Sequence, residues 1–187
     1  MRKMITVKIN GEERQYPQGA TYEDVANDYQ QEYENLIALA ARDGKIRELF
    51  KKLTRDCEVT FFTLKDDVGN KTYVRSATML FLKAVFDVYG REAAQSCRVE
   101  FAIGNGSYIS PKGKINATEE NAAKIRNRMR ELVEAKTPFL KRSYSLDNAM
   151  ELFRKEGMKD KEKLFRYRRG SFVNIYEMDG YYDYYYG

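Results

Sequence analysis

The sequence predicts an α+β protein built from two domains. Alternating strand patterns and glycine-containing turns fill most of the first sixty residues, and apolar residues at helical spacing dominate much of the remainder. Hydrophobic residues make up 43% of the 187 positions and aromatic residues 13%, which is typical of a globular chain. This length is sufficient for one large or two small hydrophobic cores.

The first predicted domain covers residues 1–63. Polar and apolar residues alternate over 5–9, Asn10-Gly11 forms a hairpin turn, and a second short strand follows at 14–16. Thr21 opens a helix with Asp24 as its capping partner. Three further strands are expected at 36–41, 45–49 and 57–62, which gives the order ββαβββ.

The second predicted domain covers residues 64–187 and is joined to the first by a polar linker at 63–72. A helix is expected at 73–89, followed by a hairpin of strands 98–103 and 107–110 around an Asn105-Gly106 turn. Thr118 caps a long helix that ends before Pro138, and another helix spans 145–156. Antiparallel strands are expected at 164–168, at 172–177 and from Tyr181 onward. The long helix is expected to turn inward the residues Ala122, Ile125, Met129, Leu132 and Val133.

The residue types exclude several kinds of active site. The chain contains no histidine, so it cannot by itself form a histidine metal site, a Ser-His-Asp triad or a Cys-His dyad. Cys57 and Cys97 lie forty positions apart without a C-x-x-C pairing, which favours buried thiols over a disulfide or metal clamp. No apolar run approaches the roughly 20 residues that span a bilayer, and the start of the chain reads as a strand. We therefore expect a cytoplasmic protein without a membrane partner.

The positive charge is concentrated in the second half of the chain. Residues 1–63 carry 10 basic and 11 acidic side chains, whereas residues 64–187 carry 23 and 17, so the net charges are −1 and +6. A phosphate-binding face is one interpretation, and a solvated helix surface is the other, because acidic residues interrupt the basic ones. The candidate nucleic-acid contacts are Lys124, Arg126, Arg128, Arg130, Arg166, Arg168 and Arg169.

The first domain resembles the TGS domain, a β-grasp (ubiquitin-like) unit shared by threonyl-tRNA synthetases, stringent-response enzymes and some GTPases. The resemblance covers residues 4–63 and rests on the order ββαβββ and on two segments. These are Gly44-Lys-Ile-Arg-Glu-Leu and the closing Asp56-Cys-Glu-Val-Thr-Phe.

The second domain resembles the α+β editing domain of threonyl-tRNA synthetases and alanyl-tRNA editing proteins. In that family a His-x-x-x-His pair on one helix face supplies two zinc ligands, and here the two positions are Arg75 and Met79. The family's second motif reads Asp-Leu-Cys-x-Gly-Pro-His, whereas this chain has Asp183 followed by Tyr184, Tyr185, Tyr186 and Gly187, with Tyr185 in place of the cysteine. The resemblance therefore implies a degenerate editing site at Arg75, Met79, Asp183 and Tyr185, with no metal and no catalytic residue.

The pairing of these two domains resembles the N-terminal region of bacterial uridine kinase-like proteins. Those proteins replace the metal ligands, carry a tyrosine-rich second motif and continue into a P-loop phosphotransferase. The stretch from Gly106 to Lys114 does not fit a P-loop, because its glycines are too far apart and no hydroxyl residue follows the lysine. The resemblance thus implies a kinase domain beyond Gly187 that binds ATP and magnesium, and no cofactor in residues 1–187.

Three functional hypotheses follow. The first is a non-catalytic recognition or regulatory region for RNA or a nucleotide, acting on behalf of an attached nucleoside kinase. The second is a threonyl-tRNA synthetase-related protein that binds RNA or edits aminoacyl-tRNA and has lost its zinc site. The third is a structural module that sets oligomerisation.

Overall fold

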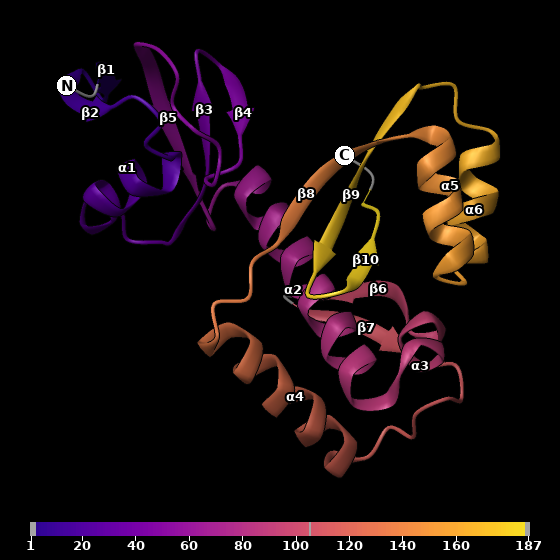
Figure 1. Cartoon of the computed structure of the whole chain (residues 1–187). Coiled ribbons are helices and arrows are strands. Elements are labelled where there is room, and N and C mark those ends of the chain that lie inside the picture. Colours follow the sequence, from indigo (N-terminus) through magenta and orange to yellow (C-terminus); the bar gives the residue numbers. More distant parts are fainter. Residues whose placement is uncertain (1–2, 105, 186–187) are drawn as a thin grey trace. The chain divides into compact units, whose positions relative to one another are not determined.

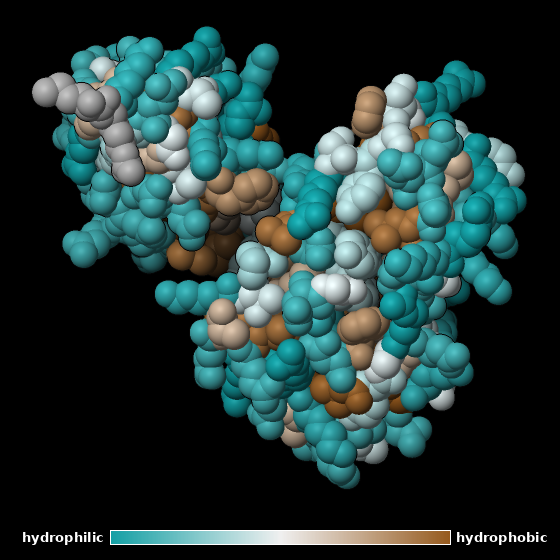
Figure 2. All heavy atoms as spheres, in the orientation of Figure 1, coloured by the Kyte–Doolittle hydropathy of each residue, from teal (hydrophilic) through white to brown (hydrophobic). Residues whose placement is uncertain are grey.

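The computed structural model confirms the α+β fold and describes residues 3–104 and 106–185 (Figure 1). The chain divides into two compact units between Ser76 and Ala77, a point that falls inside helix α2 (Asp67–Tyr89). We call Met1–Ser76 unit 1 and Ala77–Gly187 unit 2. A functional boundary after residue 63 remains a prediction. On the face shown in Figure 2, hydrophilic residues cover most of the surface, and hydrophobic residues reach it in small patches.

Unit 1 is a five-stranded sheet with one helix packed on it. The central pair of the sheet, β1 and β5, is parallel, and every other neighbouring pair is antiparallel. The sheet order β2-β1-β5-β3-β4 is the β-grasp arrangement expected from the sequence. Its elements are β1 (Met4–Ile9), β2 (Glu12–Pro17), α1 (Tyr22–Tyr29), the short 3-10 helix η1 (Gln30–Glu32), β3 (Ile37–Arg42), β4 (Lys45–Arg47) and β5 (Cys57–Thr63).

The core of unit 1 follows from the alternation in β1. Ile5, Val7 and Ile9 point to one face of the sheet and pack with Val25 and Tyr29 of α1. Helix α1 begins as predicted with a capping box, in which the Thr21 hydroxyl accepts from the Asp24 N–H at 3.1 Å and the Thr21 N–H donates to the Asp24 carboxylate at 2.7 Å.

Helix α2 begins at Asp67, so the expectation of a polar linker through residue 72 is wrong. The Asp66 carboxylate accepts from the Thr63 N–H at 2.7 Å and from the Thr63 hydroxyl at 3.0 Å, which folds the chain back at the helix start. The Asp66 carbonyl then accepts from the Asn70 N–H at 2.8 Å. A Cβ at Gly69 would lie 2.0 Å from the Thr63 carbonyl oxygen, so this close turn requires glycine.

Unit 2 combines a three-stranded antiparallel sheet of order β10-β9-β8, a separate hairpin β6–β7, and helices. The predicted Thr118 cap is confirmed, since its hydroxyl accepts from the Asn121 N–H, and the Ser145 hydroxyl likewise caps α5 by accepting from the Asn148 N–H. The predicted Asn105-Gly106 turn involves Asn105, which lies outside the described residues. The elements are α3 (Arg91–Ser96), β6 (Arg98–Ile103), β7 (Gly106–Ser110), α4 (Glu119–Glu134), β8 (Leu140–Ser145), α5 (Leu146–Lys155), α6 (Lys159–Arg166), β9 (Phe172–Met178) and β10 (Tyr181–Asp183).

One sequence expectation for unit 2 is wrong, and two elements, α3 and β8, were not expected. The segment 164–168 was expected to be a strand, but it belongs mainly to α6, which places the buried Phe165 against Phe153 of α5 at 5.2 Å between ring centroids (Figure 1). Strand β8 was not expected, because its sequence Leu-Lys-Arg-Ser-Tyr-Ser has little apolar alternation. Its pairing with β9, not its own composition, keeps it extended.

Helix α4 buries fewer of its apolar side chains than its periodicity indicated. Ile125 and Leu132 are buried and Met129 is half-buried, as expected, but Ala122 and Val133 are exposed. The core of this part of unit 2 instead draws on α2, α3 and the sheet, including Met79, Val85 and Tyr181. A second cluster joins α5 and α6 to β9 through Phe153, Phe165 and Ile175.

Candidate functional site

The positions that resemble the editing motif fall into different surroundings. Arg75 is exposed on the part of α2 that belongs to unit 1. Met79 lies one turn further along α2, in unit 2, and is only 1% exposed within the hydrophobic core. Tyr185 packs against the same core cluster as Met79, while Asp183 ends β10. The geometry therefore brings Met79 and Tyr185 into one hydrophobic cluster.

Asp183 is held in a buried ion pair. It is 4% exposed, and its carboxylate lies 3.0 Å from the Lys161 ammonium of α6. The same carboxylate accepts the Tyr184 N–H at 2.7 Å. Burial would by itself lower the pKa of Lys161, but the charges of Asp183 and Asp160 outweigh that effect and raise it. Lys161 therefore stays protonated at neutral pH, and the Asp183 carboxylate contacts both its ammonium and the Tyr184 N–H.

Tyr185, which stands where the resemblance leads us to expect a cysteine, is a phenol packed against the hydrophobic core of unit 2. Its ring packs edge-on against Tyr176, with ring centroids 5.9 Å apart. Its hydroxyl is buried and makes no hydrogen bond of normal geometry within the described part of the chain. Burial, reinforced by the charge of Asp183, raises the pKa of Tyr185 far above that of an exposed tyrosine. The phenol therefore stays neutral at physiological pH.

The set of side chains at these positions fits a packed interior better than a reactive centre. A thioether, a paired carboxylate and a neutral phenol supply neither a nucleophile next to a base nor three convergent metal ligands. Across residues 3–104 and 106–185, no group of three or more histidine, cysteine, aspartate or glutamate side chains lies together as a metal site would. Cys57 and Cys97 are free thiols whose pKa values burial raises, which makes them poor thiolates.

A buried lysine, which the sequence reading missed, organises the helix that carries Met79. Lys83 is 2% exposed, and its ammonium lies 2.7 Å from the Asp87 carboxylate. It also donates to the Asp179 carbonyl at 2.8 Å and lies 3.1 Å from the Asp179 carboxylate, in the turn between β9 and β10. The spacing of Lys83 and Asp87 on one helix face was the signal available in the sequence. This network ties α2 to the end of the sheet.

The predicted nucleic-acid contacts on α4 are largely occupied by acidic neighbours. Lys124 pairs with Glu120 at 2.7 Å and Arg126 with Glu119 at 3.2 Å. Arg128 bridges Asp87 at 2.9 Å and Glu131 at 2.8 Å, which makes it a structural contact to α2. The helix carries four basic and four acidic side chains, so its net charge is zero. Arg130 is exposed and has no ion pair within the described residues.

The predicted contacts after α5 differ among themselves. Arg166 pairs with Glu162 at 3.2 Å, and Arg168 donates to the Tyr184 hydroxyl. Arg169 is exposed and makes no ion pair in the described part of the chain. The structure thus gives the seven candidates three roles, as ion-paired surface residues, structural contacts and free cations.

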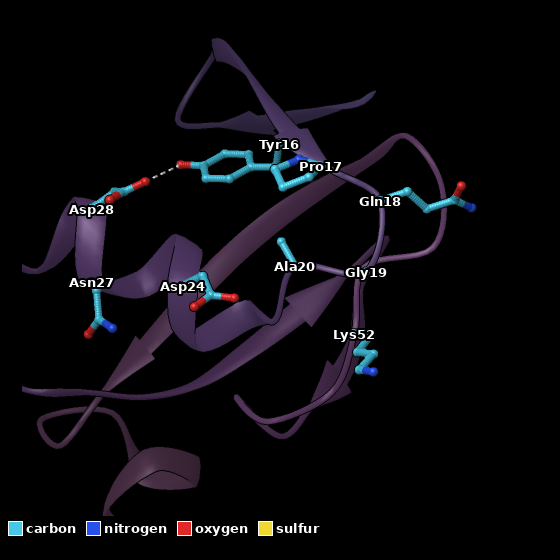
Figure 3. Close-up of a pocket in the computed structure, with 9 residues that line it drawn as sticks. All are labelled: Tyr16, Pro17, Gln18, Gly19, Ala20, Asp24, Asn27, Asp28 and Lys52. Carbon is cyan, nitrogen blue, oxygen red and sulfur yellow. Dashed lines mark hydrogen bonds between the residues drawn. The ribbon is translucent and has the colours of Figure 1, made fainter. Parts of the chain in front are cut away.

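An open pocket of about 750 Å³ lies in unit 1, between the end of β2 and the start of α1 (Figure 3). The Tyr16 hydroxyl donates to the Asp28 carboxylate at 3.0 Å along one wall. Burial, together with this hydrogen bond, raises the pKa of Tyr16 to about 12. Asp24 on the same helix is committed to the Thr21 cap. The Tyr16 hydroxyl and the carboxylates of Asp24 and Asp28 are therefore already engaged in hydrogen bonds within unit 1. Its lining is Tyr16, Pro17, Gln18, Gly19, Ala20, Asp24, Asn27, Asp28 and Lys52.

Together, these observations define a class of protein: a β-grasp unit followed by an α+β unit in which Met79 and Tyr185 pack in the core and Asp183 is ion-paired. A comparison with known proteins finds that the sequence is similar to the N-terminal part of several threonine–tRNA ligases. The chain is 27% identical to the threonine–tRNA ligase of Thermotoga neapolitana over 92% of its own length and 28% of that protein. It is 25% identical to the ligase of Carboxydothermus hydrogenoformans over the same shares. It is also 31% identical to that of Syntrophotalea carbinolica, over 74% of its own length and 23% of that protein.

The chain spans little more than a quarter of the length of the ligases it matches. The matches support the expected resemblance to threonyl-tRNA synthetases, and they extend across both units. They lend no support to the expected relation to uridine kinases. No protein-family model matches the chain. Among the helices of the described residues, none has the length and apolar character required to cross a membrane.

Proposed function

We propose that this chain is a non-hydrolysing RNA-recognition region related to threonine–tRNA ligases. One observation carries the proposal: the similarity to the ligases covers 92% of the chain, yet Met79, Asp183 and Tyr185 are engaged in packing and an ion pair. A fold retained without reactive groups is suited to binding rather than to chemistry. A cytoplasmic location belongs to the same proposal.

The proposed ligand is tRNA, the substrate named for the relatives. The net charge of the chain is +5, and its excess of basic residues lies after residue 63, as a phosphate-binding region requires. The filled site supports recognition without hydrolysis, because a neutral Tyr185 phenol and a paired Asp183 do not activate water.

The test is a binding titration of the protein with a fluorescent tRNA transcript at several salt concentrations. We expect an affinity that falls as salt rises, because each phosphate contact releases condensed cations. Heparin-coated beads serve as a control for unspecific attraction of a basic protein. A chain that does not bind tRNA at low salt would refute the proposal.

A narrower hypothesis places this region in front of a uridine kinase-like phosphotransferase that uses ATP and magnesium and lies beyond Gly187. In its favour are the replaced ligands at Arg75 and Met79 and the tyrosine-rich run that begins at Tyr181. The complete open reading frame tests it directly. A continuation with G-x-x-x-x-G-K-[ST] after a strand is the expected result under this hypothesis, and a continuation that resembles a ligase catalytic domain would overturn it.

A further inference from the structure

The end of α6 and the loop after it expose two large aromatic side chains. We call Arg166–Phe172 the arginine–aromatic segment; it comprises the last residue of α6, the loop, and the first residue of β9. The Tyr167 residue is 88% exposed and Phe172 is 66% exposed, so neither contributes appreciably to the core. Aromatic faces so open to water favour a partner that covers them.

The same stretch carries an uncompensated positive charge. Residues 163–176 include four basic side chains and no acidic one. The nearest preceding carboxylate, Glu162, is shared between Arg154 and Arg166, each at 3.2 Å. Hydrogen bonds from these two arginines lower the pKa of Glu162, so it remains ionised and still balances only one of them. Arg169 adds a further exposed cation without an ion pair in the described residues.

The backbone beneath the exposed aromatics is anchored. The Arg168 guanidinium lies over the rings of Phe165 and Tyr184, at 5.9 and 5.3 Å from their centroids, and donates to the Tyr184 hydroxyl. The Arg168 N–H also donates to the Phe165 carbonyl at 3.2 Å. Because Arg168 is held in this way, its neighbours Tyr167 and Arg169 are presented from a fixed turn, which lowers the entropy cost of binding.

Two other surfaces are poorer candidates for the same partner. Helix α4 has no net charge, as its basic side chains are matched by acidic ones. The β6–β7 hairpin exposes Phe101 and Tyr108, but these rings stack on each other at 5.2 Å, and the nearby Lys112 is paired with Glu100. Only at the arginine–aromatic segment, among these three, do open rings coincide with unbalanced cations.

We propose that the arginine–aromatic segment binds unpaired nucleotides of an RNA. Tyr167 and Phe172 stack on bases, while Arg166 and Arg169 contact the phosphates that link those bases. This combination suits a single strand, because every unpaired base offers a face for stacking and every phosphate offers a negative charge. The inference rests on the proposed RNA recognition and deepens it by naming the surface and the kind of RNA. Arg168 acts as a positioning residue for this surface.

The experiment measures fluorescence anisotropy with two labelled probes, a single-stranded RNA of about 12 nucleotides and a blunt duplex of the same length. We expect the single strand to bind more tightly. Tyr167→Ala and Phe172→Ala should each weaken its binding by about fivefold to a hundredfold, as loss of one stacked base predicts. Tyr167→Phe should retain the affinity, because it keeps the ring.

The control for the aromatic change is Phe101→Ala, which removes another exposed ring, 57% exposed, from the hairpin and should alter binding less than about twofold. For charge, Arg169→Gln should reduce the slope of log affinity against log salt by about 0.7, the value for one single-strand phosphate contact. Arg126→Gln, an ion-paired surface arginine, should leave the slope unchanged. Thermal unfolding of each variant verifies its fold.

The outcomes separate this inference from the broader proposal. Selective loss in the Tyr167 and Phe172 variants supports the inference. If the wild-type protein binds tRNA but these variants bind the single strand as well as Phe101→Ala does, the inference is overturned and RNA recognition stands. If the wild-type protein binds neither tRNA nor either probe, both fall. A change in oligomeric state with Tyr167→Ala, in place of RNA loss, would identify the surface as a protein contact and overturn the inference.

Discussion

Replacing Lys161 with methionine should destabilise unit 2 strongly. The change keeps most of the aliphatic side chain but leaves the Asp183 carboxylate buried without its cation, from which it is now 3.0 Å away. Removal of one partner from a fully buried pair costs about 3–5 kcal/mol. The Lys161 side chain retains 22% exposure, so water compensates in part, and we expect about 2–4 kcal/mol.

The assay is thermal and urea unfolding followed by circular dichroism. For a unit of this size, such a loss corresponds to a fall in melting temperature of about 10 °C. Lys159→Met is the matched control, because it removes an exposed lysine from the same helix and should cost less than about 0.5 kcal/mol. Adding Asp183→Asn to Lys161→Met should restore part of the stability, since the buried charge is then gone. Equal stability of the Lys161 and Lys159 variants would refute the conclusion that the Lys161–Asp183 ion pair stabilises unit 2.

Three further outcomes are expected. Unit 2 should lose stability as the pH rises past 10. Tyrosines such as Tyr181 and Tyr185 then ionise in the unfolded chain, whereas burial keeps them neutral in the fold, and Lys161, whose pKa is raised in the fold, loses its stabilising charge as the pH rises further. An unfolding free energy that stays constant from pH 8 to about 11 would contradict this. Purified protein should hold no stoichiometric zinc by elemental analysis, because Met79 and Tyr185, at positions where the resemblance places ligands, bind zinc too weakly to compete with water. One equivalent of zinc that survives dialysis would contradict this. Gly69→Ala should destabilise unit 1 by about 1–3 kcal/mol despite the better helix propensity of alanine, because its Cβ meets the Thr63 carbonyl; a stabilised variant would show that this turn relaxes freely.

Local chemistry made much of the fold predictable. The alternation in β1, the turn at Asn10-Gly11 and the caps at Thr21 and Thr118 each depend on neighbouring residues, and the structure confirms them. Strand β8 was not predicted and helix α6 was predicted as a strand, because partners distant in sequence decide their conformations. The polar β8 is held extended by pairing with β9, and α6 is held by the packing of Phe165 against Phe153.

The site was predictable only in part for the same reason. The motif positions Met79, Asp183 and Tyr185 came from a resemblance, but the partner of Asp183 is Lys161, twenty-two positions earlier and on a different element. The basic residues were visible in the sequence, whereas their neutralisation depends on contacts such as Arg128 with Asp87, across forty-one positions. Such contacts distinguish α4, most of whose basic side chains form ion pairs, from the arginine–aromatic segment, whose positive charge is only partly neutralised.

The most direct test of recognition without hydrolysis is the rate of deacylation of a threonine-accepting tRNA charged with serine. Serine is a suitable noncognate amino acid because it lacks only one methyl group of threonine, a difference that binding discriminates poorly. With the protein in excess over the tRNA, and with binding verified by anisotropy, we expect the ester to hydrolyse at the rate seen in buffer alone. An acceleration that saturates with protein concentration, and that Asp183→Asn removes while the variant stays folded, would contradict the account.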